Sequence, residues 1–214
     1  MRRKFDIELE VLNNELIQMG SLVEWSIENA VAALIKKDIE LAKEVIDSDG
    51  KINDMERQIE NRCLNLLLMQ QPVAGDLRTI SSILKIITDL ERIGDHAQDI
   101  SEITVKLGKE EYIKEIIDIK EMLEIVIKMV NMSIDAFINK DEQIALKVIK
   151  LDYRVNELFD IIKLDLINLI QKDKNNGEQA LNLLMIAKYL ERIGDHAQNI
   201  GEWILFLIKG EHLE

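Results

Sequence analysis

A nine-residue segment that occurs twice constrains the fold of this chain more than any other feature. The sequence LERIGDHAQ runs from Leu90 to Gln98 and again from Leu190 to Gln198. A weaker similarity joins Glu28–Ile46 to Asn131–Ile149 at an offset of 103, compared with 100 for the repeated segment. Three residues are therefore missing from the second half between these points, and loops tolerate deletions best. The sequence predicts two halves built on one plan.

The spacing of apolar residues predicts that both halves are helical. Ile83, Ile86, Leu90, Ile93 and Ala97 recur every three or four positions, which is the pattern of one helix face. One proline and nine glycines in 214 residues favour long helices, and short turns make neighbouring helices antiparallel. We predict an all-α fold of two tandem, similar three-helix bundles related by a pseudo-twofold axis, residues 1–108 and 109–214, with helices near 5–37, 38–70, 75–107, 111–139, 141–172 and 177–209.

Helix starts and turns are expected at defined places. Asp38 and Asp141 can accept hydrogen bonds from the free N–H groups at the start of a helix. Pro72 and Gly75 in the first half, and residues Asn175–Gly177 in the second, are expected to break the chain between two helices.

Composition and charge indicate the class of protein. The chain is 47% apolar and 31% charged, as in folded globular proteins, and its formal net charge is -13. Such acidity repels nucleic-acid phosphates and attracts metal cations or basic partner surfaces, so we expect no nucleic-acid partner. The single cysteine, Cys63, is expected to be a buried thiol in a reducing compartment. We recognise no signal peptide or span long enough to cross a bilayer, and we expect a cytoplasmic location.

Acidic residues form a stripe on the two helices that carry the repeated segment. Glu91 and Asp95 lie one helical turn apart, away from the apolar face, and Asp99 extends the stripe by another turn. The second half repeats the first two acids, but Asn199 replaces Asp99. The candidate ligands are the acidic and amide residues on these and the preceding helices: Asp49, Asn53, Glu91, Asp95 and Asp99, then Asp152, Asn156, Glu191 and Asp195.

The preceding helices differ between the halves beyond these positions. In the first half the stripe continues with Glu56 and Glu60, whereas the second half has Phe159 and Lys163 at the equivalent places. We therefore expect the stripe of the preceding helix to be weaker in the second half.

Two interpretations fit the stripes. Acidic stripes are common on solvated helix faces, and repulsion between like charges one turn apart costs only about 0.2–0.5 kcal/mol per pair. The other interpretation is a metal site, because oxygen ligands one turn apart can hold one cation or bridge two. Nine identical residues in two otherwise divergent halves favour the metal site. Iron, manganese, magnesium, calcium and zinc all suit such oxygen ligands.

Residues beside the stripes are expected to have supporting roles. His96 and His196 lie off the stripe, where they support the ligands or occupy the surface instead of binding metal. Gly94 and Gly194 stand inside helices at a cost of about 1 kcal/mol each relative to alanine. We expect these glycines to allow close approach of a neighbouring helix.

With these motifs the chain resembles the PhoU family of phosphate-uptake regulators. The resemblance rests on QQPVAGDLR, on both copies of LERIGDHAQ and on the duplicated three-helix plan, although the second half lacks the P-x-x-x-D-L-R turn. It implies a cytoplasmic, all-helical, often dimeric protein. It also implies partners, namely the ATPase subunit of the phosphate ABC transporter and the phosphate-sensing histidine kinase, with membrane contact only through them.

The resemblance further implies metal clusters bound through the E/D-x-x-x-D motifs. It assigns this role to Glu91, Asp95, Glu191 and Asp195, while Asp49, Asn53, Asp152 and Asn156 match acidic and amide positions on the facing helices. Since Asn199 breaks the extension that Asp99 makes, the two sites are expected to differ in affinity or in the number of ions bound.

Two other function classes stay open beside a non-enzymatic regulator. A carboxylate-bridged metalloenzyme of the ferritin type needs histidine three residues after glutamate, whereas His96 follows Glu91 by five. No phosphate-binding loop or catalytic triad pattern is recognised either. A plain helical adaptor would use the stripe only to meet a basic partner. Metal analysis of the purified protein distinguishes the regulator from the plain adaptor. Oxidase or hydrolase assays distinguish the regulator from the metalloenzyme.

Overall fold

The computed structural model describes residues 2–69, 72–108, 111–113 and 117–211 of the chain. Within these ranges it contains six α-helices, one short 3-10 helix and no β-strand. The elements are α1 (Arg2–Lys36), α2 (Ile39–Met69), α3 (Ala74–Leu107), α4 (Ile117–Asn139), α5 (Glu142–Lys172), η1 (Lys174–Asn176) and α6 (Gly177–Lys209). The predicted all-α fold with two similar three-helix halves is confirmed.

Equivalent turns start the second helix of each half. Asp141 accepts hydrogen bonds from the N–H groups of Gln143 and Ile144 at 2.8 and 3.1 Å, and Asp38 accepts one from Leu41 at 3.1 Å. Both helix starts therefore lie where the sequence predicts them. The residues before them, Lys37 and Lys140, have φ values of 55° and 49°. The two halves thus share even the left-handed turn residue.

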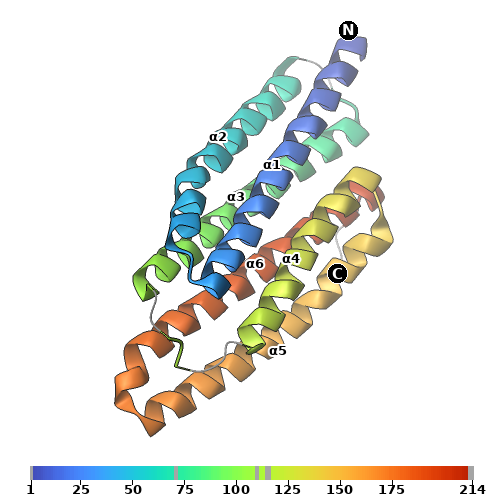
Figure 1. The fold of residues 1–214 in the computed structure, drawn as a ribbon. Helices are drawn as coiled ribbons and strands as arrows, with labels where there is room; N and C mark the ends of the chain where they lie inside the picture. Colours follow the sequence, from blue (N-terminus) through green and yellow to red (C-terminus); the bar gives the residue numbers. More distant parts are fainter. Residues whose placement is uncertain (1, 70–71, 109–110, 114–116, 212–214) are drawn as a thin grey trace.

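The helices that carry the repeated segment, α3 and α6, lie in the middle and join the two halves (Figure 1). They are antiparallel, because Lys106 near the end of α3 bonds to Asn182 near the start of α6, at 3.4 Å. At the other end, Gly210 after α6 lies against the Arg78 side chain near the start of α3. Buried apolar residues from all six helices form one continuous core, so the two halves are packed directly against each other.

Two glycines let the second helix of each half approach the third closely. A Cβ atom on Gly94 would lie 2.8 Å from Ile52 Cδ1, and one on Gly194 would lie 3.2 Å from both Val155 Cγ1 and Asp152 Oδ1. This confirms the role expected for these glycines. The close approach brings the polar side chains of α2 next to those of α3, and those of α5 next to α6.

The connection between the halves differs from the prediction. Residues 111–113 are not helical, and α4 begins at Ile117 instead of residue 111. Tyr112 Oη donates to the Leu34 carbonyl at 2.6 Å, and the Ile113 N–H donates to the Gln179 side chain. These tertiary contacts replace the helical hydrogen bonds of this segment. The predicted boundary at 108/109 adjoins residues 109–110, which lie outside the described ranges, and the division into two domains stays a prediction.

The turn before α3 also differs in detail. Residues 70–71 of the predicted turn lie outside the described ranges, and α3 begins at Ala74, so Gly75 falls inside its first turn. The Val73 N–H donates to Asp76 Oδ2 at 3.2 Å, which fixes this helix start. None of the described helices is long and apolar enough to span a membrane.

Candidate metal-binding clusters

The first cluster lies between α2 and α3 and consists of Asp49, Asn53, Glu91, Asp95 and Asp99. Asn53 Nδ2 donates to Asp49 Oδ2 at 2.8 Å, which fixes the Asp49 carboxylate. Asp49 is only 9% exposed, and its other oxygen, Oδ1, has no hydrogen-bond partner among the described residues. A buried acceptor left without a hydrogen bond costs about 1–3 kcal/mol. The cluster therefore offers a fixed, buried oxygen ready for a donor or a cation.

Negative charge is concentrated around this oxygen. Burial raises the pKa of Asp49 above its usual value, and the nearby carboxylates of Asp95 and Asp99 raise it further. Burial and the Asp95 carboxylate likewise raise the pKa of Glu91. Arg92 offsets part of the repulsion, with its guanidinium 3.5 Å from Glu91 and 3.2 Å from Asp95. Carboxylates crowded in this way repel one another when ionised, and a cation among them would relieve that repulsion.

The second cluster occupies the equivalent place between α5 and α6 and consists of Asp152, Asn156, Glu191 and Asp195. Asn156 Nδ2 donates to Asp152 Oδ2 at 2.7 Å, and Asp152 Oδ1 has no partner among the described residues. Asp152 is 7% exposed, and burial together with the Asp195 and Glu191 carboxylates raises its pKa to about 6. The same arrangement of a clamped aspartate and a free buried oxygen thus occurs twice.

The second cluster has a basic side chain at a position where the first cluster has a neutral one. The Lys188 ammonium pairs with Glu191 and lies 5.2 Å from the centre of the Phe159 ring. Asn199 turns away from the cluster, and its Nδ2 donates to Asp89 of α3 at 3.2 Å. The sequence prediction that Asn199 does not continue the stripe agrees with this contact. Lys188 was missed, although its place three residues before Glu191 is the spacing of a helical ion pair.

The structure brings together the residues predicted from the sequence, in two groups coupled by charge. Glu91, Asp95, Glu191 and Asp195 are half-buried against the facing helices, so these positions are less exposed than a solvated stripe. Within the described ranges, no three His, Cys, Asp or Glu side chains are arranged as a ready metal-ligand group. Metal binding by these residues stays a prediction that the geometry does not test.

The two histidines lie at the contact between the halves. Their rings are 5.7 Å apart, His196 Nδ1 lies 2.8 Å from Asp89 Oδ1, and the His96 ring stacks on Tyr189 at 5.4 Å. Asp89 and Tyr189 are equivalent positions, so each histidine meets the same position of the opposite helix. Helical spacing predicts that the histidines lie off the stripe but does not predict this contact, because the contact depends on the antiparallel packing of α3 and α6.

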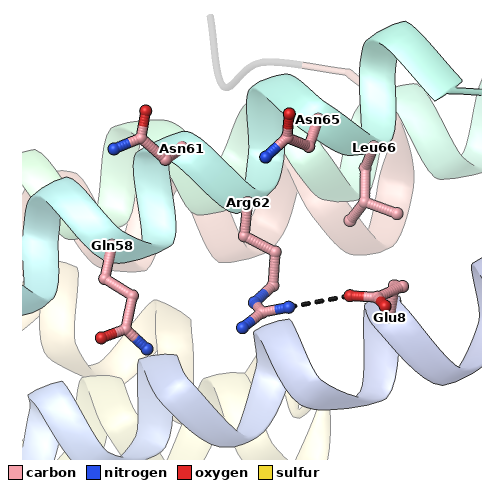
Figure 2. A pocket seen from close by; sticks show the side chains of 6 residues that line it. All are labelled: Glu8, Gln58, Asn61, Arg62, Asn65 and Leu66. Atoms are coloured by element: carbon pink, nitrogen blue, oxygen red, sulfur yellow. Dashed lines mark hydrogen bonds and ion pairs between the residues drawn. The ribbon is translucent and has the colours of Figure 1, made fainter.

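A polar pocket lies away from both clusters, between α1 and α2 (Figure 2). In it Arg62 reaches from α2 to α1 and pairs with Glu8 at 2.8 Å and with Glu15 at 2.7 Å. Gln58 Nε2 also donates to Glu15, while Asn61 points away from α1. Two carboxylates already neutralise this arginine, so its ion pairs link α1 to α2. The pocket therefore does not resemble an anion site.

The oxygen donors of the two clusters fit a hard or borderline metal cation. Asp49 Oδ1, Asn53 Oδ1 and Asp152 Oδ1 are buried acceptors without partners among the described residues. Carboxylate and amide oxygens are the ligands that such cations prefer.

Comparison with known proteins identifies what the chain is similar to. The family model described as PhoU domain matches residues 16–104 and again 119–204. The chain is 39% identical to the phosphate-specific transport system accessory protein PhoU homolog of Clostridium acetobutylicum, covering 100% of this chain and 98% of that protein. The crystal structure of PhoU from Pseudomonas aeruginosa superposes with a TM-score of 0.95 at 38% identity, covering 97% of this chain and 100% of the other. The phosphate transport system regulatory protein PhoU from Streptococcus pneumoniae superposes with a TM-score of 0.89 at 29% identity, covering 98% and 99%.

Proposed function

The chain belongs to the PhoU family, and we propose that it regulates phosphate uptake as an accessory protein of a phosphate-specific transport system. The observation that carries this proposal is the likeness to named accessory and regulatory proteins over nearly the full length of both chains. These relatives are named as regulators and not as enzymes, which supports a non-enzymatic role.

In this proposal the protein acts in the cytoplasm as an adaptor between two partners. One is the ATPase subunit of the phosphate ABC transporter, and the other is the histidine kinase that senses phosphate. The net charge of -13 suits basic surfaces on such partners.

The two clusters hold metal ions in this proposal. Asp49, Asn53, Glu91, Asp95 and Asp99 would provide the ligands of the first, and Asp152, Asn156, Glu191 and Asp195 those of the second. The free buried oxygens of Asp49 and Asp152, at the same place in both halves, support this assignment. A bound cation neutralises the crowded carboxylates. The fold positions the ligands by packing α2 closely against α3 at Gly94, and α5 closely against α6 at Gly194.

The adaptor acts as a homodimer in this proposal. Exposed apolar side chains on α5 and α6 support self-association: Ile161, Leu164, Ile167, Leu181 and Met185. The first half has Gln58 and Asn61 at the places equivalent to Ile161 and Leu164, so these two apolar positions occur in the second half only, whereas Ile167 corresponds to the exposed Leu64. Sedimentation equilibrium would show a dimer, which Leu164→Asn should weaken while the equivalent Asn61→Asp leaves it unchanged.

Deleting the gene tests the regulatory role. Under phosphate-replete growth we expect the deletion strain to derepress phosphate uptake and starvation genes, and we expect the wild-type gene to restore repression. Labelled phosphate uptake and transcript levels are the measurements. Unchanged uptake and transcription in the deletion strain contradict the proposal.

A variant with Glu91, Asp95, Glu191 and Asp195 all replaced by alanine separates the role of the clusters from that of the surface. If it folds but does not restore repression, metal binding serves regulation. If it restores repression fully, the plain adaptor is the better interpretation.

A further inference from the structure

Position 188 is the clearest difference in charge between the two clusters. The Lys188 ammonium pairs with the Glu191 carboxylate, which is a candidate ligand. It also lies over the Phe159 ring of the facing helix, 5.2 Å from the ring centre. Two contacts thus place one positive charge at the edge of the second cluster.

The first half has no charge at the equivalent position. Thr88 takes the place of Lys188, and its hydroxyl donates to the Leu84 carbonyl of its own helix at 3.1 Å. Glu56 takes the place of Phe159, and repulsion within the acidic surroundings contributes to raising its pKa after burial. The first cluster therefore has an acid on the facing helix where the second has a ring that supports a lysine.

We propose that the Lys188 ammonium is a built-in counter-ion of the second cluster and makes that cluster bind divalent cations more weakly than the first. The inference rests on the proposed metal-binding role of the clusters. A metal ion that approaches Glu191 must displace the ammonium or bind beside a like charge, and both cost free energy. Arg92 and Arg192 pair with Asp95 and Asp195 in both halves, so the additional charge at position 188 is the one that the first cluster lacks at position 88. The two sites therefore fill in order, first cluster before second, as the cation concentration rises.

The chain offers a matched control in Lys163. Its ammonium also lies near the Phe159 ring, at 5.4 Å from the centre, but it pairs with Asp160 at 2.5 Å, which is not a candidate ligand. Replacing Lys163 or Lys188 changes the net charge equally. Of these two changes, only Lys188→Thr removes a charge that pairs with the cluster, and it copies the residue of the first half.

Mn²⁺ titration by calorimetry of protein stripped with chelator tests the proposal. The variant E91A/D95A leaves only the second cluster, and E191A/D195A leaves only the first. We expect Mn²⁺ to bind more tightly in E191A/D195A. Adding K188T to E91A/D95A should tighten binding about tenfold, as removal of one nearby charge predicts. Adding T88K to E191A/D195A should weaken binding by a similar factor, whereas K163T should change it less than twofold.

The possible failures are distinguishable. Equal small effects of K188T and K163T, with Mn²⁺ bound in both backgrounds, would overturn the counter-ion role and leave the metal-binding role intact. Binding in E191A/D195A but none in E91A/D95A/K188T would also overturn the inference, because the second cluster would then not be a site. No Mn²⁺ binding by the wild-type protein would contradict both the metal-binding role and the inference.

Discussion

The two halves of the molecule keep the same repeated segment, but the residues around it differ. In α3 and α6 the residues LERIGDHAQ are identical, and in both halves an amide on the facing helix clamps a buried aspartate at 2.7–2.8 Å. One turn further along the facing helix, Glu56 in the first half is Phe159 in the second. Lys188 then adds a positive charge that Thr88 does not.

The repeated residues alone therefore do not set the charge around each cluster. The motif helix provides the carboxylates and the glycine that permits close packing. Residues outside the repeated segment, such as Glu56 or Phe159 on the facing helix and Thr88 or Lys188 on the motif helix itself, set the charge around the carboxylates.

The largest difference in stability is expected when the ion pairs that link α1 to α2 and α4 to α5 are removed. Arg62→Ala leaves Glu15, which is 8% exposed, without its main partner, and we expect a loss of about 3 kcal/mol of unfolding free energy. In the second half Arg154 links α5 to Glu121 of α4 at 2.7 Å, but these two side chains are nearly half exposed, at 43% and 45%. Arg154→Ala should change the stability little. Urea unfolding measures the loss of unfolding free energy in both variants. Equal losses would show that the two interhelical ion pairs contribute equally to stability.

The pH dependence of stability should reveal the raised pKa of Asp152 in the second cluster. The pKa of Asp152 is raised to about 6, so its contribution to stability is fully present below its unfolded pKa and is lost as pH rises through 6. In chelator-treated protein, Asp152→Asn removes the ionised form and should stabilise by about 2 kcal/mol at pH 7.5 and by less than about 1 kcal/mol at pH 4.

Asp49→Asn is the matched variant of the first half. The pKa of Asp49 is also raised, by burial first and then by Asp95, so its effect should have the same sign. Unfolding measured at both pH values checks the pair of variants. A destabilising effect of Asp152→Asn at pH 7.5 would show that the ionised carboxylate is stabilised by contacts other than those described.

The glycines provide the smallest and most local test. A Cβ on Gly194 meets Val155 and Asp152 at 3.2 Å, and we expect Gly194→Ala to lose about 1 kcal/mol. Gly94→Ala should lose less, because the atom it meets is the end of the flexible Ile52 side chain. Gly50→Ala, in open space on α2, should gain about 0.5–1 kcal/mol. Thermal melts of the three variants would contradict the close-packing role if all three gained stability.

The sequence predicts most of the fold because the helix signals are local and repeated. Asp38 and Asp141 start their helices as expected, and the repeated segment lies on corresponding helices. The start of α4 could not be predicted, because Tyr112 and Gln179 hold the preceding segment through contacts 66–78 residues apart in the chain. Helix propensity carries no information about such contacts.

The sequence also predicts which carboxylates lie together, because helical spacing and the duplication both point to them. It does not predict that Glu91 and Asp95 are half-buried, because burial depends on how closely Gly94 lets α2 approach. The histidine contact was missed for a related reason. It requires the antiparallel pairing of α3 and α6, which no spacing within one helix reveals.

The central claim is that the repeated acids form cation sites of unequal strength. Thermal melts of the wild type, E91A/D95A and E191A/D195A, each with bound metal and with chelator, test it most directly, together with the metal content of each protein. Each double variant should carry about half the wild-type metal at saturation, and chelator should lower the wild-type melting temperature. E91A/D95A should lose more of that chelator-dependent shift than E191A/D195A. If chelator does not affect the wild type, and both variants melt slightly higher in both conditions because repulsion of a few tenths of a kcal/mol is relieved, the acids form a solvated stripe and not cation sites.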